Sequence, residues 1–201
     1  MNEAKTFLEP IAGYMLDVLN KLRNRPFVPH SLMKLHNLKF CKQITNSTTV
    51  IEIGTYKGVT AKRLSRIFDS VISVEISPEL YEISCKRCEN RTNIELILGD
   101  GSDELPKIAA RVSNAVLFLD GHFSGADTSQ GDEPEPVLKE LDFIKPYLEN
   151  FNAIVIDDFR LFGVDKGWPK KSEVMAKLEQ VLPEGLWKHH IMNDQFVIIR
   201  S

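Results

Sequence analysis

One acidic residue and two glycines have the spacing in this chain that most clearly suggests chemistry. The apolar run 50–53 contains Glu52 and leads into Gly54 and Gly58, after which the pattern becomes helical. Glycines at such a turn leave little side-chain bulk, so a ligand can lie close to the backbone amides. About twenty residues further on, a second apolar run ends in Glu75, where a carboxylate can accept hydrogen bonds from ribose hydroxyls. The two features together predict a site for a nucleotide-type cofactor.

Two more acids follow apolar runs in the same way. Asp100 comes after the third run, where it can accept from an adenine amino group, and Asp120 ends the fourth. An acid at a strand end is often only a helix cap or a solvated loop residue, but four at successive ends favour one shared site. The residues expected to contact the cofactor are Glu52, Gly54, Thr55, Tyr56, Lys57, Gly58, Glu75, Ile76, Asp100, Gly101, Ser102 and Asp120.

Three carboxylates point to a second kind of chemistry. The fifth apolar run ends in Asp157 and Asp158, and neighbouring strands of a parallel sheet would bring both close to Asp120. Unpaired carboxylates repel one another and raise each other's pKa, and a hard divalent cation such as Mg²⁺ relieves the repulsion. The alternative is that Asp157 and Asp158 cap the next loop while Asp120 touches only the cofactor.

The elements that must position these residues alternate along the chain. Strands are expected at 49–53, 71–75, 94–98, 115–119, 153–157, 187–192 and 195–200, with helices near 58–68, 77–90, 102–111, 135–149 and 170–181. This alternation is typical of an α/β fold whose mostly parallel sheet carries helices on both faces. Asn193 and Asp194 separate the last two strands and signal a hairpin, so the last strand is expected to be antiparallel.

Two predicted helices, 3–22 and about 30–45, precede the first strand. We therefore expect a helical extension over residues 1–45 and a catalytic domain over residues 46–201. The extension and the loop 121–136, which is long enough to be a lid or binding loop, would shape an acceptor pocket. The helix 3–22 also carries an apolar stripe, and a homodimer contact is one way to cover it.

Composition narrows the function classes. The chain has 201 residues, 43% of them hydrophobic, enough for one α/β domain with a full core. Its net charge of −3, without a run of Lys or Arg, predicts no nucleic-acid partner. No apolar run is long enough for a membrane span, and no secretory signal is recognisable. Three cysteines are too few for a disulfide framework, so we expect a cytoplasmic setting.

With these residues in view, the chain resembles a class I S-adenosylmethionine-dependent methyltransferase over roughly residues 30–201. Glu52-x-Gly54-x-x-x-Gly58 matches the first motif of that family, Glu75 its ribose-binding acid and Asp100 its acid near adenine. The terminal hairpin matches the seven-stranded, Rossmann-like sheet of the family. The resemblance implies S-adenosyl-L-methionine as the cofactor.

The substrate side is similar to cation-dependent small-molecule O-methyltransferases of the catechol and macrolide-sugar type. The resemblance implies that Asp120, Asp157 and Asp158 hold Mg²⁺, which binds two adjacent hydroxyls of a small, sugar-like acceptor. His122 stands where some of these enzymes carry a basic Asp, so it is a candidate base beside Asp120; a loop histidine bonded to a neighbour is the alternative. Residues 119–125 and 157–163 also resemble a little-characterised group of small bacterial methyltransferases.

Two other functions stay open. A nucleotide-binding oxidoreductase is disfavoured because the turn lacks the Gly-x-Gly-x-x-Gly triplet that cradles a pyrophosphate. A non-catalytic cofactor-binding module is disfavoured by the intact set of three carboxylates. Methylation of nucleic-acid amino groups is disfavoured because Asp120-Gly121-His122 stands where such enzymes carry an Asn/Asp-Pro-Pro-aromatic motif.

Overall fold

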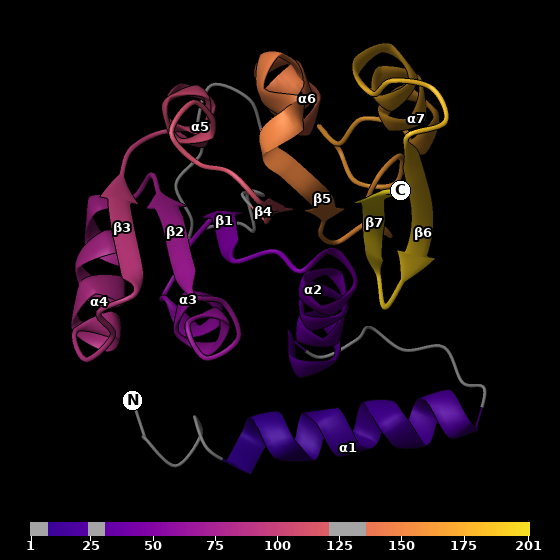
Figure 1. The fold of residues 1–201 in the computed structure, drawn as a ribbon. Coiled ribbons are helices and arrows are strands. Elements are labelled where there is room, and N and C mark those ends of the chain that lie inside the picture. Colours follow the sequence, from indigo (N-terminus) through magenta and orange to yellow (C-terminus); the bar gives the residue numbers. More distant parts are fainter. Residues whose placement is uncertain (1–7, 24–30, 121–135) are drawn as a thin grey trace.

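The computed structural model of the chain describes residues 8–23, 31–120 and 136–201. At its centre lies a seven-stranded sheet with the strand order β3-β2-β1-β4-β5-β7-β6 (Figure 1). The strands are β1 (Thr49–Ile53), β2 (Ser70–Glu75), β3 (Ile94–Leu98), β4 (Ala115–Leu119), β5 (Phe151–Ile156), β6 (Trp187–Met192) and β7 (Gln195–Arg200). Strands β1 to β5 pair in parallel, which confirms the predicted α/β class.

Helices cover both faces of the sheet, as the near-continuous apolar strands require. One face carries α5 (Gly101–Ala109), α6 (Val137–Ile144), the 3-10 helix Lys145–Asn150 and α7 (Lys171–Val181). The other carries α2 (Ser31–Thr45), α3 (Val59–Leu64) and α4 (Pro78–Cys88), with α1 (Leu8–Leu22) against α2 on the outside (Figure 1). Alternate residues of each strand serve the two cores: Ile51 and Ile53 face the first set of helices, and Val50 faces the second.

The predicted hairpin forms, with one refinement. Strand β7 runs antiparallel to both β5 and β6 and lies between them, so β6 is the edge strand. Asn193 and Asp194, which connect β6 to β7, have φ values of 48° and 64°. Two consecutive left-handed residues are what a tight two-residue hairpin demands, and Asn and Asp tolerate that conformation well. Because β7 is antiparallel, this turn lies at the same edge as the carboxyl ends of β1 to β5.

Helix α2 belongs to the layer that covers the sheet, although it lies within the predicted N-terminal extension. Its Leu38 and Cys41 are fully buried in the core shared with β4 and β5. The Asn37 amide donates to the Met192 carbonyl and to Gln195 Oε1, each at 2.8 Å, which fixes α2 to the hairpin. Helix α1 instead leaves Met15, Leu16, Leu19 and Leu22 exposed, and the homodimer contact there remains a prediction.

All three cysteines are free thiols. Within the described residues, no helix combines the length and the apolar character that crossing a membrane would require.

Candidate active site

The acids predicted from the sequence lie along one edge of the sheet. Backbone hydrogen bonds tie the strand ends together: Gly99 N donates to the Glu75 carbonyl at 2.9 Å, Gly54 N to the Val74 carbonyl at 3.0 Å, and Asp120 N to the Ile53 carbonyl at 2.9 Å. Asp157 N continues the series by donating to the Leu119 carbonyl at 3.0 Å. The residues that follow β3, β1, β4 and β5 therefore form a continuous rim at the carboxyl ends of the strands, where open α/β sheets bind ligands.

The turn after β1 has a backbone that only glycine accommodates easily. Gly54, Tyr56 and Gly58 have φ values of 98°, 51° and 71°. A Cβ atom on Gly58 would lie 2.9 Å from Ser84 Cβ on α4, so a side chain there would push α4 away. Gly58 N donates to the Thr55 carbonyl at 2.9 Å, which closes the turn just before α3. The glycine spacing thus reflects both a left-handed backbone and a close helix approach.

Other residues of this turn are held by short contacts or lie at the surface. Thr55 is buried, and its hydroxyl lies 2.6 Å from the Ser73 hydroxyl. Tyr56 is 41% exposed, and Lys57 Nζ lies 4.8 Å from the centre of its ring. Tyr56 and Lys57 can therefore reach a ligand above the turn, whereas the Thr55 side chain is committed to the sheet.

Glu52 is a carboxyl group buried inside the fold beneath this turn. It has no exposed surface, and its Oε2 accepts from the Ser73 hydroxyl at 2.5 Å. Its Oε1 has no hydrogen-bond partner among the described residues. Burial raises the pKa of Glu52 to about 8; the Ser73 hydrogen bond opposes this shift and the Glu75 carboxyl adds to it. A buried oxygen without a partner is costly, and a cationic ligand group or a bridging water would relieve it.

Glu75 is oriented by the backbone around it. Its Oε2 accepts from Tyr56 N at 2.6 Å and its Oε1 from Ser77 N at 2.9 Å. Burial raises the pKa of Glu75, while the backbone hydrogen bonds from Ser77, Tyr56 and Ile76 oppose the shift. The three backbone bonds leave part of the acceptor capacity of the carboxylate unused, so Glu75 can still accept from a ribose hydroxyl. Ile76 is half-buried beside it.

Asp100 caps the helix that follows β3. Its Oδ1 accepts from Ser102 N at 2.8 Å at the start of α5, the role that the sequence analysis offered as the alternative to adenine binding. The second carboxylate oxygen leaves that binding open. A Cβ atom on Gly101 would overlap Ile53 Cγ2, so α5 can approach β1 only with glycine at this position.

Asp120 follows β4 and lies between the two ends of the rim, which we call the donor end (Glu52, Glu75 and Asp100) and the acceptor end (Asp157 and Asp158). Burial raises its pKa well above the ordinary value, the carboxyls of Asp157, Glu52 and Asp158 add to the shift, and the Lys34 ammonium opposes it. These couplings place Asp120 within electrostatic reach of both ends of the rim, as the sequence predicted. The other candidate base, His122, lies outside the described residues.

Asp157 and Asp158 lie together at the end of β5, and a lysine sits between them. Lys34 Nζ of α2 is 2.9 Å from Asp157 Oδ1 and still closer to Asp158 Oδ1. Burial lowers the pKa of Lys34, but the two carboxylates outweigh burial and raise it overall. Asp158 has a φ of 49°, a left-handed conformation that turns its side chain toward this lysine.

Two further charged groups complete the cluster. Arg160 donates from Nη1 to Asp158 Oδ1 at 2.7 Å and also to Asp194 Oδ2. Asp194 Oδ2 lies 3.8 Å from Lys34 Nζ, and Asp194 Oδ1 accepts from Arg160 N at 2.8 Å. The structure thus pairs Arg160 with nearby aspartates.

Sequence reasoning missed Lys34 and Asp194 as site residues. Asp194 was taken only as a hairpin residue, although an antiparallel β7 next to β5 necessarily returns its turn to the rim. Lys34 carried no recognisable signal, because it lies on a helix before the first strand and meets Asp158 only through a contact across 124 positions of the chain.

The acceptor end does not fit a divalent cation. Within the described part of the chain, no group of three or more His, Cys, Asp or Glu side chains is arranged to hold a metal. The Lys34 ammonium takes the place between Asp157 and Asp158 that a cation would need. The prediction that Asp120, Asp157 and Asp158 bind Mg²⁺ therefore gains no support from this geometry.

The other end of the rim does fit S-adenosylmethionine. Among the described residues, Glu52 Oε1 is a buried acceptor without a partner, and the glycines at both ends of the turn leave backbone there uncovered by a side chain of their own. Glu75 and Asp100 are pre-oriented by backbone amides at the positions expected for the ribose and the adenine.

Comparison with known proteins gives two kinds of match, one to part of the sequence and one to the fold of nearly the whole chain. The family model of ribosomal RNA adenine dimethylases matches residues 26–109, less than half of the chain. The "Probable ribosomal RNA small subunit methyltransferase A" of Methanosarcina acetivorans is 31% identical over 103 residues, which are 48% of this chain and 38% of that protein. The chain thus matches well under half of that relative's length.

These matches correct one prediction. The sequence analysis excluded a nucleic-acid partner, and that exclusion is contradicted by a family model and a relative that are both named for ribosomal RNA. The physical reason is that a net charge averages over the whole chain. Lys62 and Arg63 on α3 and Lys86 and Arg87 on α4 gather locally, and Arg66 and Arg87 help to lower the pKa of Arg63, after burial.

Solved structures match over nearly the whole chain. The O-methyltransferase of Bacillus cereus in complex with SAH has a TM-score of 0.62 and 16% identity, over 100% of this chain and 93% of that one. The O-methyltransferase TomG of Streptomyces achromogenes, in complex with SAM, has a TM-score of 0.60 and 16% identity, over 90% of this chain and 86% of that one. Together with the strand order and the antiparallel β7, these matches show that the chain has the class I S-adenosylmethionine-dependent methyltransferase fold.

Proposed function

We propose that this chain transfers a methyl group from S-adenosylmethionine to a hydroxyl of a small, sugar-like acceptor. The observation that carries the proposal is the continuous rim, on which the Glu52–Glu75 side and the Asp120–Asp157 side meet at neighbouring strand ends. A donor held at the first side would present its methyl group toward the second. Most of the catalysis would then come from positioning the two reactants.

The first side supplies donor binding. S-adenosylmethionine, when bound, brings an already electrophilic sulfonium methyl. Glu52 would face its ammonium group, and Glu75 would accept from its ribose hydroxyls. The glycines of the turn from Gly54 to Gly58 would let its backbone approach the cofactor, and Asp100 would accept from the adenine amino group.

The second side supplies acceptor binding and proton removal. Burial and nearby carboxyls raise the pKa of Asp120, which makes it a better proton acceptor than an ordinary aspartate. Asp120 would take the proton of the acceptor hydroxyl as the oxygen attacks the methyl carbon. His122 remains a second candidate for this base.

An RNA adenine is the second candidate acceptor. The family match over residues 26–109 favours it. So does a basic group on α3, in the turn just after it and on α4: Lys62, Arg63, Arg66, Lys86 and Arg87. Positive side chains of this kind bind phosphate backbones independently of sequence. The matched residues end before β4, however, so they include the donor side of the rim and none of Asp120, Asp157 or Asp158.

Transfer of a radiolabelled methyl group tests both acceptors. The chain is incubated with labelled S-adenosylmethionine and either a panel of sugar-like polyols or ribosomal RNA, with and without an Asp120→Asn substitution. Label in a polyol, lost with Asp120→Asn, supports the proposal. Label in RNA adenine assigns the second function.

Cofactor binding separates these outcomes from the remaining alternatives. Thermal unfolding with S-adenosylmethionine and with NAD distinguishes a methyltransferase from an oxidoreductase, since only the true cofactor raises the midpoint. Binding of S-adenosylmethionine without transfer to any acceptor would instead identify a non-catalytic module.

A further inference from the structure

A lysine from the N-terminal part of the chain occupies the acceptor end of the rim. Lys34 Nζ lies 2.9 Å from Asp157 Oδ1, in contact with Asp158 Oδ1 and 3.8 Å from Asp194 Oδ2. Its side chain is only 13% exposed, and those of Asp157 and Asp194 are 7% exposed. The ammonium group is therefore enclosed by three carboxylates that come from β5 and from the β6–β7 turn.

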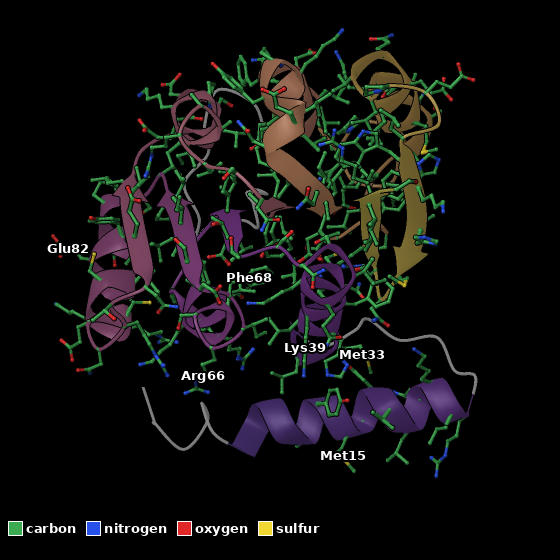
Figure 2. The ribbon with its side chains drawn as sticks, viewed as in Figure 1. Met15, Met33, Lys39, Arg66, Phe68 and Glu82 are labelled. Carbon is green, nitrogen blue, oxygen red and sulfur yellow. The ribbon has the colours of Figure 1, made fainter. Side chains whose placement is uncertain are left out.

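The fold holds this lysine in place. Helix α2 packs on the sheet through buried Leu38, and Asn37 bonds to both sides of the hairpin. Asn193 also donates from its amide to Asn37 Oδ1 at 3.0 Å. Figure 2 labels Met33 and Lys39 on the same helix. Lys34 thus approaches the carboxylates from a helix that the hairpin itself anchors.

We propose that the Lys34 ammonium acts as a built-in cation at the acceptor site and takes the place of a divalent metal. This inference rests on the proposed methyl transfer and specifies how its acceptor is held. Three carboxylates face two cationic groups, Lys34 and Arg160, so a large part of the repulsion that would otherwise attract Mg²⁺ is already relieved.

The same lysine can orient the acceptor. An ammonium group has three N–H donors. Two carboxylates are within hydrogen-bonding distance of Lys34 Nζ, whereas Asp194 Oδ2 at 3.8 Å is not. Of the carboxylates that the described residues place near Lys34, two can each take one N–H. The third N–H can therefore donate to a hydroxyl oxygen of the methyl acceptor. Lys34 would in this way fix the hydroxyl, the task for which related chemistry uses a metal.

Binding of Mn²⁺, a probe for Mg²⁺ sites, tests the inference without relying on turnover. Calorimetry and electron paramagnetic resonance are recorded for the wild-type chain, for Lys34→Met, and for Lys34→Met combined with Asp157→Asn. Wild type is expected to bind no Mn²⁺ at the rim, Lys34→Met to bind one ion, and the double variant to lose that ion. Lys39→Met is the matched control, because Lys39 is exposed on the same helix and should behave as wild type.

Stoichiometric Mn²⁺ binding to wild type that Asp157→Asn abolishes would overturn the inference. So would a folded Lys34→Met variant that binds no Mn²⁺. Folding is checked by binding of S-adenosylhomocysteine, and Lys34→Gln replaces Lys34→Met if the latter fails this check. If methyl transfer is found, an excess of chelator should leave the wild-type rate unchanged. An absence of transfer to every acceptor would defeat the proposed function while leaving the Mn²⁺ result to be judged separately.

Discussion

The two ends of the rim are built in different ways. At the donor end, backbone amides orient the two acids. Glu75 accepts from Ser77 N, two residues further along, and from Tyr56 N in the turn after β1. Asp100 accepts from Ser102 N, also two residues further along. At the acceptor end, ion pairs orient Asp157 and Asp158, and one of them reaches across 124 positions of the chain. The donor end therefore depends on turns close to the strand ends, whereas the acceptor end depends on how distant elements dock.

Glu75 provides the largest expected effect at the donor end. Glu75→Gln should weaken binding of S-adenosylhomocysteine on the order of 100-fold, about 2–3 kcal/mol, because a charged acceptor for the ribose is lost. Calorimetry measures the change. Glu79→Gln, an exposed position in the first turn of α4, is the control. An unchanged affinity in Glu75→Gln would show that this carboxylate is not part of the donor site.

Gly58 tests whether the local turn tolerates a side chain. Gly58→Ala should lower the free energy of unfolding by about 2 kcal/mol more than Gly185→Ala, because overpacking adds to the backbone cost. The two glycines have similar φ values, 71° and 75°, but a Cβ on Gly58 meets Ser84 while one on Gly185 meets nothing within 4 Å. Urea unfolding gives both values. Equal losses of unfolding free energy in the two variants would mean that α4 shifts away from the added methyl group at little cost.

Asn37 tests the long-range character of the acceptor end. Asn37→Ala removes the buried bonds to Met192 and Gln195 and should cost about 1–2 kcal/mol of unfolding free energy. It should also reduce methyl transfer while leaving binding of S-adenosylhomocysteine unchanged. Asn90→Ala, an exposed position, serves as the control. A parallel loss of donor affinity would break the division between the two ends.

Glu52 gives an effect that depends on pH. Its folded-state pKa of about 8 exceeds the ordinary value of 4.5, so between these values the native state keeps a proton that the unfolded chain releases. The contribution of Glu52 to the free energy of unfolding is therefore fully present below about pH 4.5. It falls as the pH rises toward 8, with a slope of about 1.4 kcal/mol per pH unit. Glu52→Gln should remove that slope.

Urea unfolding across this pH range measures the difference between Glu52→Gln and wild type. Glu82→Gln, which alters an exposed glutamate on α4 (Figure 2), should leave the wild-type slope intact. Glu52→Gln should also bind S-adenosylmethionine more weakly, since an amide attracts the ammonium group of the cofactor less than a carboxylate does. Parallel curves for Glu52→Gln and wild type would contradict the raised pKa.

What the sequence could predict follows the same division. The seven strands lie within two residues of their predicted bounds, because buried apolar runs and turn residues are local signals. The acids predicted for the donor end have a local signal of the same kind, since each lies within or directly after such a run. Asp120, Asp157 and Asp158 were also placed correctly at neighbouring strand ends. Lys34 and Asp194 carry no such signal, because only tertiary docking brings them into an ion-paired cluster with Asp157 and Asp158.

The position of β7 has a consequence for how the protein matures. Residues 49–102 contain β1 to β3 and every donor-side group except Asp120, whereas the acceptor side needs α2 near the start and the β6–β7 turn near residue 194. Contacts that close long stretches of chain form late, since they require more conformational order beforehand. The donor end can thus take shape before the acceptor end, and the proposed methyl transfer would become possible only once the hairpin docks on α2.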